Sequence, residues 1–200
     1  PVLRPSHLPA VELYRPTDLS ELLTHVAEGA HPLAGGTDII VWASQRGEPR
    51  RLAWTGGIEE LHDLDMSEER FYIGAAVTLS RIVRSSQLLS LAPAVVDGAA
   101  VLGSVQLRNQ ATLVGNVCTA SPGGDTIPGL QVHDATVDII SSEGNRRSVR
   151  ISDFVHAPGQ TSLNEGELVV GVTLRGLGPR EGSVFRRFTQ RNALDLAVAS

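Results

Sequence analysis

The sequence predicts an α+β fold in two lobes, with a parallel sheet in the small lobe and a mainly antiparallel sheet in the larger lobe. In residues 1–57, strand and helix signals alternate, which is typical of parallel strands joined by helical crossovers. In residues 58–200, several strand-like segments and a hairpin turn indicate an antiparallel sheet. A chain of 200 residues is long enough to bury a core that both lobes share.

The elements of the small lobe follow from a helix cap, helical periodicity and a glycine. Asp18 and Glu21 stand three residues apart, as in a capping box, and mark the start of a helix. Apolar residues then recur at helical spacing until Gly29, which ends the helix. The other predicted elements of this lobe are strands at residues 11–14, 31–34 and 51–54 and a helix at residues 39–44.

The larger lobe is predicted to contain two helices and five strands. A long helix at about residues 88–102 is apolar on most sides and is therefore expected to be buried. A further helix begins after Asp125, and residues 142–145 fit a hairpin turn. The predicted strands are Phe71–Ile73, Ala135–Ser141, Ser148–Ile151, Leu168–Leu174 and Ser183–Thr189.

Composition excludes several kinds of chemistry. All 17 basic residues are arginine, so the chain cannot supply the lysine of a P-loop or of a Schiff base. Cys118 is the single cysteine, which excludes a disulfide, a cysteine-rich zinc site or an iron–sulfur cluster within this chain. The histidines lack metal-ligand spacing, so no metal site is expected. A net charge of −5 argues against general nucleic-acid binding, and the lack of a long apolar run predicts a cytoplasmic protein without membrane contact.

A first candidate binding segment joins a predicted strand to a predicted helix through paired glycines. It consists of Pro32, Leu33, Ala34, Gly35, Gly36, Thr37, Asp38 and Ile39. Glycines let backbone N–H groups approach an anion closely, and the N-terminus of a helix adds partial positive charge. The alternative is a tight strand–helix turn without a ligand, in which Thr37 or Asp38 is the N-cap.

A second candidate segment, residues 107–126, is rich in small hydroxyl, amide and glycine residues. Its pattern is too irregular for core, and it offers many hydrogen-bond donors with little bulk, as a phosphate- or flavin-lined cleft requires. Two of its residues also have purely structural interpretations. Asp125 is a good N-cap for the helix that follows it, and Cys118 fits a small buried apolar position.

Taken together and in order, these segments resemble the FAD-binding subunit of molybdenum hydroxylases of the xanthine dehydrogenase and carbon monoxide dehydrogenase type. The resemblance covers nearly the whole chain and implies an α+β FAD-binding fold of the PCMH/VAO type. Its motifs are PLAGGTD at residues 32–38, IGAAVTLSRI at residues 73–82, LRNQATLVGN at residues 107–116 and TASPGGDTIPGL at residues 119–130.

The resemblance also implies which residues hold FAD. Residues 32–39 would wrap the pyrophosphate with backbone amides, and residues 112–116 would form a second loop on the phosphate side. Asp125 would contact the flavin end, and Leu102 and Val169 would make apolar contacts. The implied cofactor-binding residues are Pro32, Leu33, Ala34, Gly35, Gly36, Thr37, Asp38, Ile39, Leu102, Thr112, Val114, Gly115, Asn116, Asp125, Val169 and Arg186.

The sequence departs from the family pattern in three places. Val114 precedes Gly115 where the family has two glycines, and Arg186 stands where many relatives have lysine. An arginine keeps the charge but changes the geometry of its donors. The sequence ends at Ser200, whereas relatives continue into a smaller C-terminal lobe, so we expect that lobe to be missing here.

By this resemblance, the chain would be the flavin subunit of a hetero-oligomeric oxidoreductase. It would relay electrons from the [2Fe–2S] clusters of a small subunit through FAD to NAD+, a quinone or oxygen. Substrate hydroxylation would occur on a large subunit that carries the molybdenum cofactor, and no residue of this chain is assigned as catalytic. One alternative is an interaction module with a degenerate flavin pocket. Another, a nucleotide-binding enzyme without flavin, fits the glycine loops but not the ordered motifs.

Overall fold

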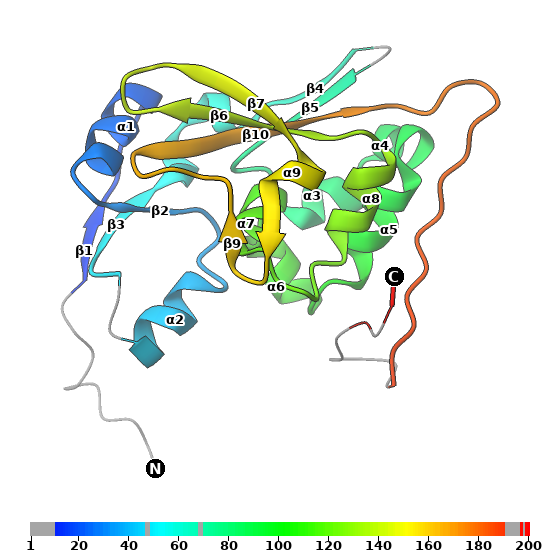
Figure 1. Cartoon of the computed structure of the whole chain (residues 1–200), viewed down its shortest axis with the longest axis horizontal. Coiled ribbons are helices and arrows are strands. Elements are labelled where there is room, and N and C mark those ends of the chain that lie inside the picture. Colours follow the sequence, from blue (N-terminus) through cyan, green and yellow to red (C-terminus); the bar gives the residue numbers. More distant parts are fainter. Residues whose placement is uncertain (1–10, 47–48, 68–69, 191–196, 198) are drawn as a thin grey trace.

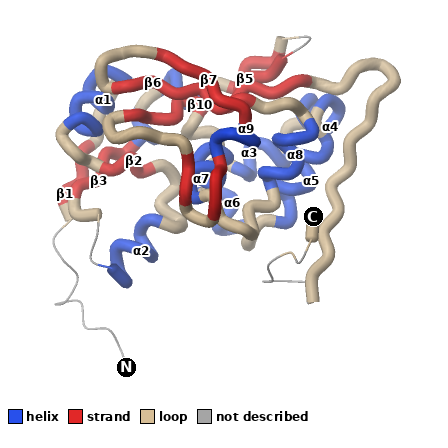
Figure 2. The backbone as a smooth tube through the Cα atoms, viewed as in Figure 1, coloured by secondary structure: helices blue, strands red, loops and turns tan. Residues whose placement is uncertain are grey.

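The computed structural model describes residues 11–46, 49–67, 70–190, 197, 199 and 200. It contains a parallel three-stranded sheet in the order β1-β3-β2 and an antiparallel five-stranded sheet in the order β4-β5-β10-β6-β7. Strands β8 and β9 form a separate pair. Figure 1 shows the larger sheet across one side of the molecule with most helices beneath it, and Figure 2 shows the same separation by element type. The predicted α+β fold is confirmed.

The small sheet and its helices match the predicted elements closely. Asp18 caps the first helix, because its carboxylate accepts a hydrogen bond of 2.8 Å from the backbone N–H of Glu21. The Glu21 carboxylate in turn accepts from the N–H of Thr17, which closes the turn before the helix. The elements are β1 (Glu12–Tyr14), α1 (Leu19–Ala27), β2 (His31–Leu33), α2 (Ile39–Arg46) and β3 (Arg51–Trp54), followed by the 3₁₀ turns η2 (Thr55–Gly57) and η3 (Glu59–His62).

The larger sheet is built around its longest strand. Strand β10 pairs with β5 on one side and with β6 on the other. The short strands β4, β8 and β9 were not predicted. The strands of this part of the chain are β4 (Leu64–Met66), β5 (Arg70–Gly74), β6 (Thr136–Ser141), β7 (Arg146–Arg150), β8 (Val155–Ala157), β9 (Gln160–Thr161) and β10 (Glu167–Arg175).

Seven short helices lie among the described residues of this part of the chain. They are α3 (Leu79–Val83), α4 (Ser86–Leu91), α5 (Pro93–Val101), α6 (Val105–Gln110), α7 (Leu113–Thr119), α8 (Thr126–Val132) and α9 (Ile151–Phe154). The single long helix predicted at residues 88–102 is therefore wrong. Ala92 has φ −144° and ψ 55°, which ends α4, and Pro93 starts α5. A proline disfavours helical geometry in the residue before it but fits the first position of a helix.

The predicted strand Ser183–Thr189 is also wrong, because this segment pairs with no strand of the larger sheet. Within the described residues, its single β contact is an isolated bridge between Phe188 and Ala199. The strand before it in the chain, β10, already has a partner on each side. The segment instead runs in extended form beside the helices (Figure 1).

One continuous apolar core connects the two sheets. Leu22 and Leu23 of α1 and Ala53 of β3 belong to the same cluster of buried residues as Phe71 and Ile73 of β5. The smaller sheet is therefore anchored to the larger part of the chain through α1. The lobe boundary at residue 57 stays a prediction.

Helices α5 and α8 pack against each other at two glycines. A Cβ atom added to Gly98 would lie 2.3 Å from the carbonyl oxygen of Asp125, and one added to Gly129 would lie 2.8 Å from that of Ala94. The two backbones can approach this closely because neither glycine has a side chain. This contact sets the position of Asp125 at the start of α8.

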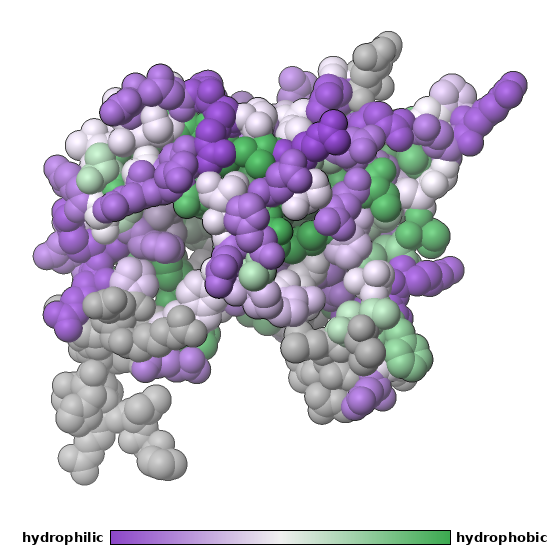
Figure 3. Space-filling view, in the orientation of Figure 1, coloured by the Kyte–Doolittle hydropathy of each residue, from purple (hydrophilic) through white to green (hydrophobic). Residues whose placement is uncertain are grey.

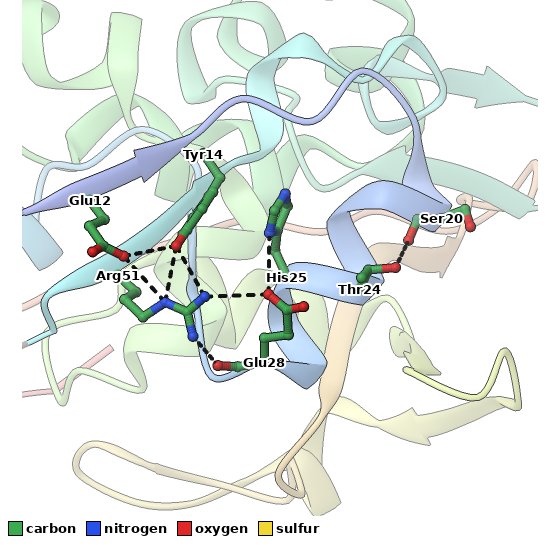
Figure 4. A network of polar contacts seen from close by, with 7 residues as sticks. All are labelled: Glu12, Tyr14, Ser20, Thr24, His25, Glu28 and Arg51. Carbon is green, nitrogen blue, oxygen red and sulfur yellow. Dashed lines mark hydrogen bonds and ion pairs between the residues drawn. The ribbon is translucent and has the colours of Figure 1, made fainter.

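A polar network around Arg51 joins β1, α1 and β3 (Figure 4). The Tyr14 hydroxyl accepts hydrogen bonds from Arg51 Nε and Nη2 at 3.2 and 3.0 Å and donates to the Glu12 carboxylate at 2.8 Å. Arg51 also donates to the backbone carbonyl and the carboxylate of Glu28. The Tyr14 ring stacks on His25 with 4.2 Å between centroids. These contacts hold the outer strand of the small sheet to its helix.

Glu167 fixes the start of the central strand β10. Its carboxylate accepts two hydrogen bonds from Arg147 at 2.7 and 2.6 Å, and two more from the backbone and side chain of Asn164 at 2.8 and 3.1 Å. The hydrogen bond from Arg147 is the main reason that the pKa of Glu167 is lowered from 4.5 to about 2. A forked arginine–carboxylate pair of this kind is stronger than a pair of neutral groups.

We expect Glu167→Gln to reduce the free energy of unfolding by about 1–2 kcal/mol at pH 7. Because folding lowers the pKa of Glu167, its contribution is fully present above about pH 4.5 and is lost as the pH falls toward about 2. Urea unfolding of wild type and variant should therefore differ at pH 7 and converge as the pH falls to about 2. Glu165→Gln, at an exposed position two residues away, is the matched control. A difference that stays constant with pH would contradict this assignment.

Candidate functional site

A cleft of about 870 Å³ lies between the small sheet and the helices of the larger part of the chain. One wall is the loop from β2 to α2. The other is formed by the turn between α5 and α6, by α7 and by the loop that leads to α8. The volume falls within the usual range for cofactor and ligand sites, roughly 300–1,000 Å³.

Three successive residues of the β2–α2 loop, Gly36, Thr37 and Asp38, line the cleft. In the described part of the chain, the amides of Gly36, Thr37 and Asp38 donate to no protein acceptor. Gly36 has φ +72°, a conformation that favours glycine, and the loop leads into the N-terminus of the eight-residue helix α2. Successive free amides at a helix N-terminus suit an anion such as a phosphate group.

Gly35 brings this loop against the opposite wall. A Cβ atom added to Gly35 would lie 2.0 Å from the carbonyl oxygen of Gln110 and 2.9 Å from the Cα of Ala111. The two walls of the cleft therefore meet through backbone atoms at this point. The glycine is required by this close approach.

The second wall is more regular than the sequence predicts. Residues 107–126 include the end of α6, all of α7 and the start of α8, so the expectation of an irregular segment was wrong over much of its length. Thr112 caps α7, because its hydroxyl accepts a hydrogen bond of 3.0 Å from the N–H of Gly115. The side chain of Asn116, which also lines the cleft, accepts one of 2.7 Å from Thr126.

A side-chain contact links the two walls across the cleft. The Thr119 hydroxyl at the end of α7 lies 3.0 Å from the Asp38 carboxylate and 2.9 Å from the carbonyl oxygen of Gly115. Asp38 is thereby held at the N-terminal side of α2, where its charge faces the cleft.

Asp125 lies in the cleft wall as half of an ion pair. Asp125 is the N-cap residue of α8, as predicted, but its carboxylate makes no capping bond and instead accepts a hydrogen bond of 2.9 Å from Arg187. The side chains of Asp125 and Arg187 are only 8% and 17% exposed. Burial raises the pKa of Asp125 above its ordinary value, and Arg187 partly opposes this by favouring the carboxylate.

Cys118 and His31 complete the titratable groups of the cleft wall. Burial raises the pKa of the Cys118 thiol to about 12, so the thiol is protonated and unreactive at neutral pH. Cys118 packs against the core and also lines the cleft, which agrees in part with the predicted apolar position. Burial lowers the pKa of His31, so its ring is neutral at pH 7. No three His, Cys, Asp or Glu residues among those described are grouped to hold a metal ion.

The structure brings twelve of the sixteen predicted cofactor residues together in this cleft. The other four do not line it: Leu33, Val114 and Val169 are buried in the core, and Arg186 is exposed. Sequence reasoning missed Trp42 and Arg187, which line the cleft, and included Thr119 only as part of the candidate segment at residues 107–126. The twelve are Pro32, Ala34, Gly35, Gly36, Thr37, Asp38, Ile39, Leu102, Thr112, Gly115, Asn116 and Asp125.

An α+β fold with a cleft of this size, free amides at a helix N-terminus and few charged side chains is typical of a nucleotide-cofactor-binding protein. Residues 9–174 match the family described as the FAD binding domain in molybdopterin dehydrogenase, and the chain belongs to that family. This confirms the family resemblance and FAD as its cofactor.

Individual relatives agree with this assignment. The chain is 29% identical to the nicotinate dehydrogenase FAD-subunit of Eubacterium barkeri over 94% of its own length and 66% of that protein. It is 28% identical to the xanthine dehydrogenase FAD-binding subunit of Escherichia coli O157:H7 over 92% of its own length and 65% of that protein. It therefore spans about two thirds of the length of these relatives.

Solved structures show the same fold. Carbon monoxide dehydrogenase from Hydrogenophaga pseudoflava superposes with a TM-score of 0.88 at 22% identity, covering 94% of this chain and 67% of that one. Quinoline 2-oxidoreductase from Pseudomonas putida 86 superposes with a TM-score of 0.87 at 27% identity, covering 95% of this chain and 66% of that one. In the described part of this chain, no helix has both the length and the apolar character needed to cross a membrane.

Proposed function

We propose that the cleft binds FAD and that the chain serves as the flavin subunit of a molybdenum hydroxylase. The observation that carries this proposal is the group of free amides at residues 36–38 in a cleft whose other wall holds Asp125. Free amides beside a helix N-terminus suit a pyrophosphate. The residues present therefore fit the cofactor of the family.

Each part of the cleft has a separate binding task in this proposal. The amides of the β2–α2 loop would hold the pyrophosphate. The opposite wall would border it with Thr112, Gly115 and Asn116. Space beside Gly115 is open, because the Thr112 hydroxyl, at 3.0 Å, is the single atom that an added Cβ would meet within 4 Å. Asp125, held by Arg187, would accept a hydrogen bond from the flavin end of the cofactor. Leu102 would supply apolar contact at the cleft wall.

The flavin supplies the redox chemistry when bound, because it can hold one electron or two. This chain would bind and orient the flavin. The Asp125 carboxylate, paired with the Arg187 guanidinium, would lie beside it. We propose that a small subunit with [2Fe–2S] clusters delivers single electrons and that NAD+, a quinone or oxygen accepts the pair. Substrate hydroxylation would occur on a large subunit with the molybdenum cofactor.

The electron-relay part of this proposal can be tested on the FAD-loaded chain. The flavin is reduced anaerobically and then mixed separately with NAD+, with a soluble quinone and with oxygen, while its visible absorbance is followed. We expect rapid reoxidation by at least one of the three. Bound flavin that no acceptor reoxidises would contradict the relay. A chain that binds no flavin would favour the interaction-module alternative.

A further inference from the structure

Residues 183–189, called the strap here, run as an extended segment from the turn after β10 along the helices (Figure 1). Their side chains alternate in exposure. Ser183, Phe185 and Arg187 are buried or half-buried, whereas residues 184, 186 and 188 are exposed. Alternation with a period of two is a property of extended chain. The register of the strap therefore decides which of the two adjacent arginines faces the cleft.

Ser183 anchors the strap to two separate elements. Its hydroxyl oxygen accepts a hydrogen bond of 3.2 Å from the N–H of Ala94 in the first turn of α5, and it lies 2.8 Å from Nε2 of His133. His133 is 1% exposed, and its Nδ1 lies 2.8 Å from the carbonyl oxygen of Arg175. Because that carbonyl can only accept, Nδ1 donates to it, and Nε2 lies within hydrogen-bond distance of the Ser183 hydroxyl.

The turn that leads into the strap is also held. Leu177 donates its N–H to the carbonyl of Leu91 at the end of α4. The Glu181 carboxylate accepts from the N–H of Gly178 at 2.9 Å and from Arg175 at 2.5 Å. These hydrogen bonds hold the path of the chain between β10 and Ser183. Figure 3 shows hydrophilic residues over much of this face, broken by hydrophobic patches, and the strap pairs with no strand of the larger sheet.

From these contacts we infer that Ser183 and His133 are positioning residues for the FAD site, because they set the strap register that places Arg187 against Asp125. Arg187 lies four residues beyond Ser183 and so has the same inward orientation, while Arg186 faces solvent. A shift of one residue would exchange the two arginines. The inference rests on the proposed function, since it assigns these residues to the same cleft.

The first test removes the anchor and then restores it. We expect Ser183→Ala to weaken FAD binding about tenfold, since it removes both hydrogen bonds that hold the register. Ser183→Thr keeps the hydroxyl and should return the affinity to within about twofold of wild type. The visible circular dichroism of the bound flavin should change in the alanine variant and recover in the threonine variant. Arg180→Ala, at an exposed arginine in the preceding turn, controls for the loss of a positive charge in Arg187→Ala.

A double-mutant cycle separates positioning from general stability. We expect Arg187→Ala to weaken FAD binding about tenfold and Ser183→Ala to add less than about twofold in that background. Additive losses would overturn the inference, as would a loss in Arg186→Ala as large as that in Arg187→Ala. Wild-type protein that fails to bind FAD would overturn the proposed function as well. If the wild-type protein binds FAD and the losses in the two single variants add in the double variant, this inference alone is overturned.

Discussion

Gly35→Ala is expected to weaken FAD binding by more than about a hundredfold, which corresponds to about 2.8 kcal/mol. The new Cβ would lie 2.0 Å from the carbonyl oxygen of Gln110, and its nearest neighbours are all backbone atoms. Neither wall can relieve this overlap by turning a side chain. The β2–α2 loop must move away from α6, which displaces the amides of residues 36–38 from the phosphate position.

This result is measured as the dissociation constant from a titration of the apo-protein with FAD. Gly182→Ala is the matched control, because a Cβ there meets no atom within 4 Å and we expect unchanged affinity. The thermal midpoint of each apo-protein is recorded in parallel, so that loss of the cleft is distinguished from loss of the fold. Unchanged FAD affinity in Gly35→Ala would show that the cofactor does not use this loop.

Gly98→Val should destabilise the fold by about 3 kcal/mol, at the upper end for overpacking. Its Cβ would lie 2.3 Å from the carbonyl oxygen of Asp125, so α5 and α8 must separate. The higher helix propensity of valine returns at most about 1 kcal/mol, and the clash therefore dominates. Because the clash is with Asp125 itself, FAD affinity should fall as well.

Thermal unfolding measures the first effect. A chain of this size should lose about 6–12 °C in its midpoint for 3 kcal/mol. Ala100→Val lies in the same helix at a half-buried position and should cost less than about 1 kcal/mol, the scale of a propensity difference. A midpoint of Gly98→Val equal to that of the control would mean that the two helices are packed less closely than described.

The sequence predicts best those parts of the fold that local signals determine. The Asp18 cap and the apolar spacing after it correctly predict α1, and the predicted strand Leu168–Leu174 lies within β10. The break at Ala92 was missed because both flanking helices are apolar and read as one. Pro93 was the available signal, since the residue before a proline disfavours helix.

The strap shows why an extended pattern alone does not predict a strand. Its alternation is real, but a strand also needs a free neighbour, and β10 already has two. The same alternation predicts that Ser183, Phe185 and Arg187 share a face. Phe185 is apolar and marks the inward side, so it was the signal that could have favoured Arg187 over Arg186.

The sequence predicts the part of the cleft that the backbone of the glycine loop forms. Paired glycines and a following helix marked residues 32–39 as a candidate binding segment, and all of these residues except Leu33 line the cleft. The ion pair of Asp125 with Arg187, by contrast, joins positions 62 residues apart. Its formation depends on the packing of α5, α8 and the strap, and no local pattern carries that information.

The flavin content of the purified chain tests the central claim most directly. The protein is incubated with excess FAD, freed of unbound cofactor by gel filtration and denatured by heat, and the released flavin is identified and quantified against protein. Our account predicts FAD at close to one per chain, with FMN failing to replace it because FMN lacks the pyrophosphate for the amides of residues 36–38. A chain that retains no flavin, or that binds FMN as well as FAD, would contradict it.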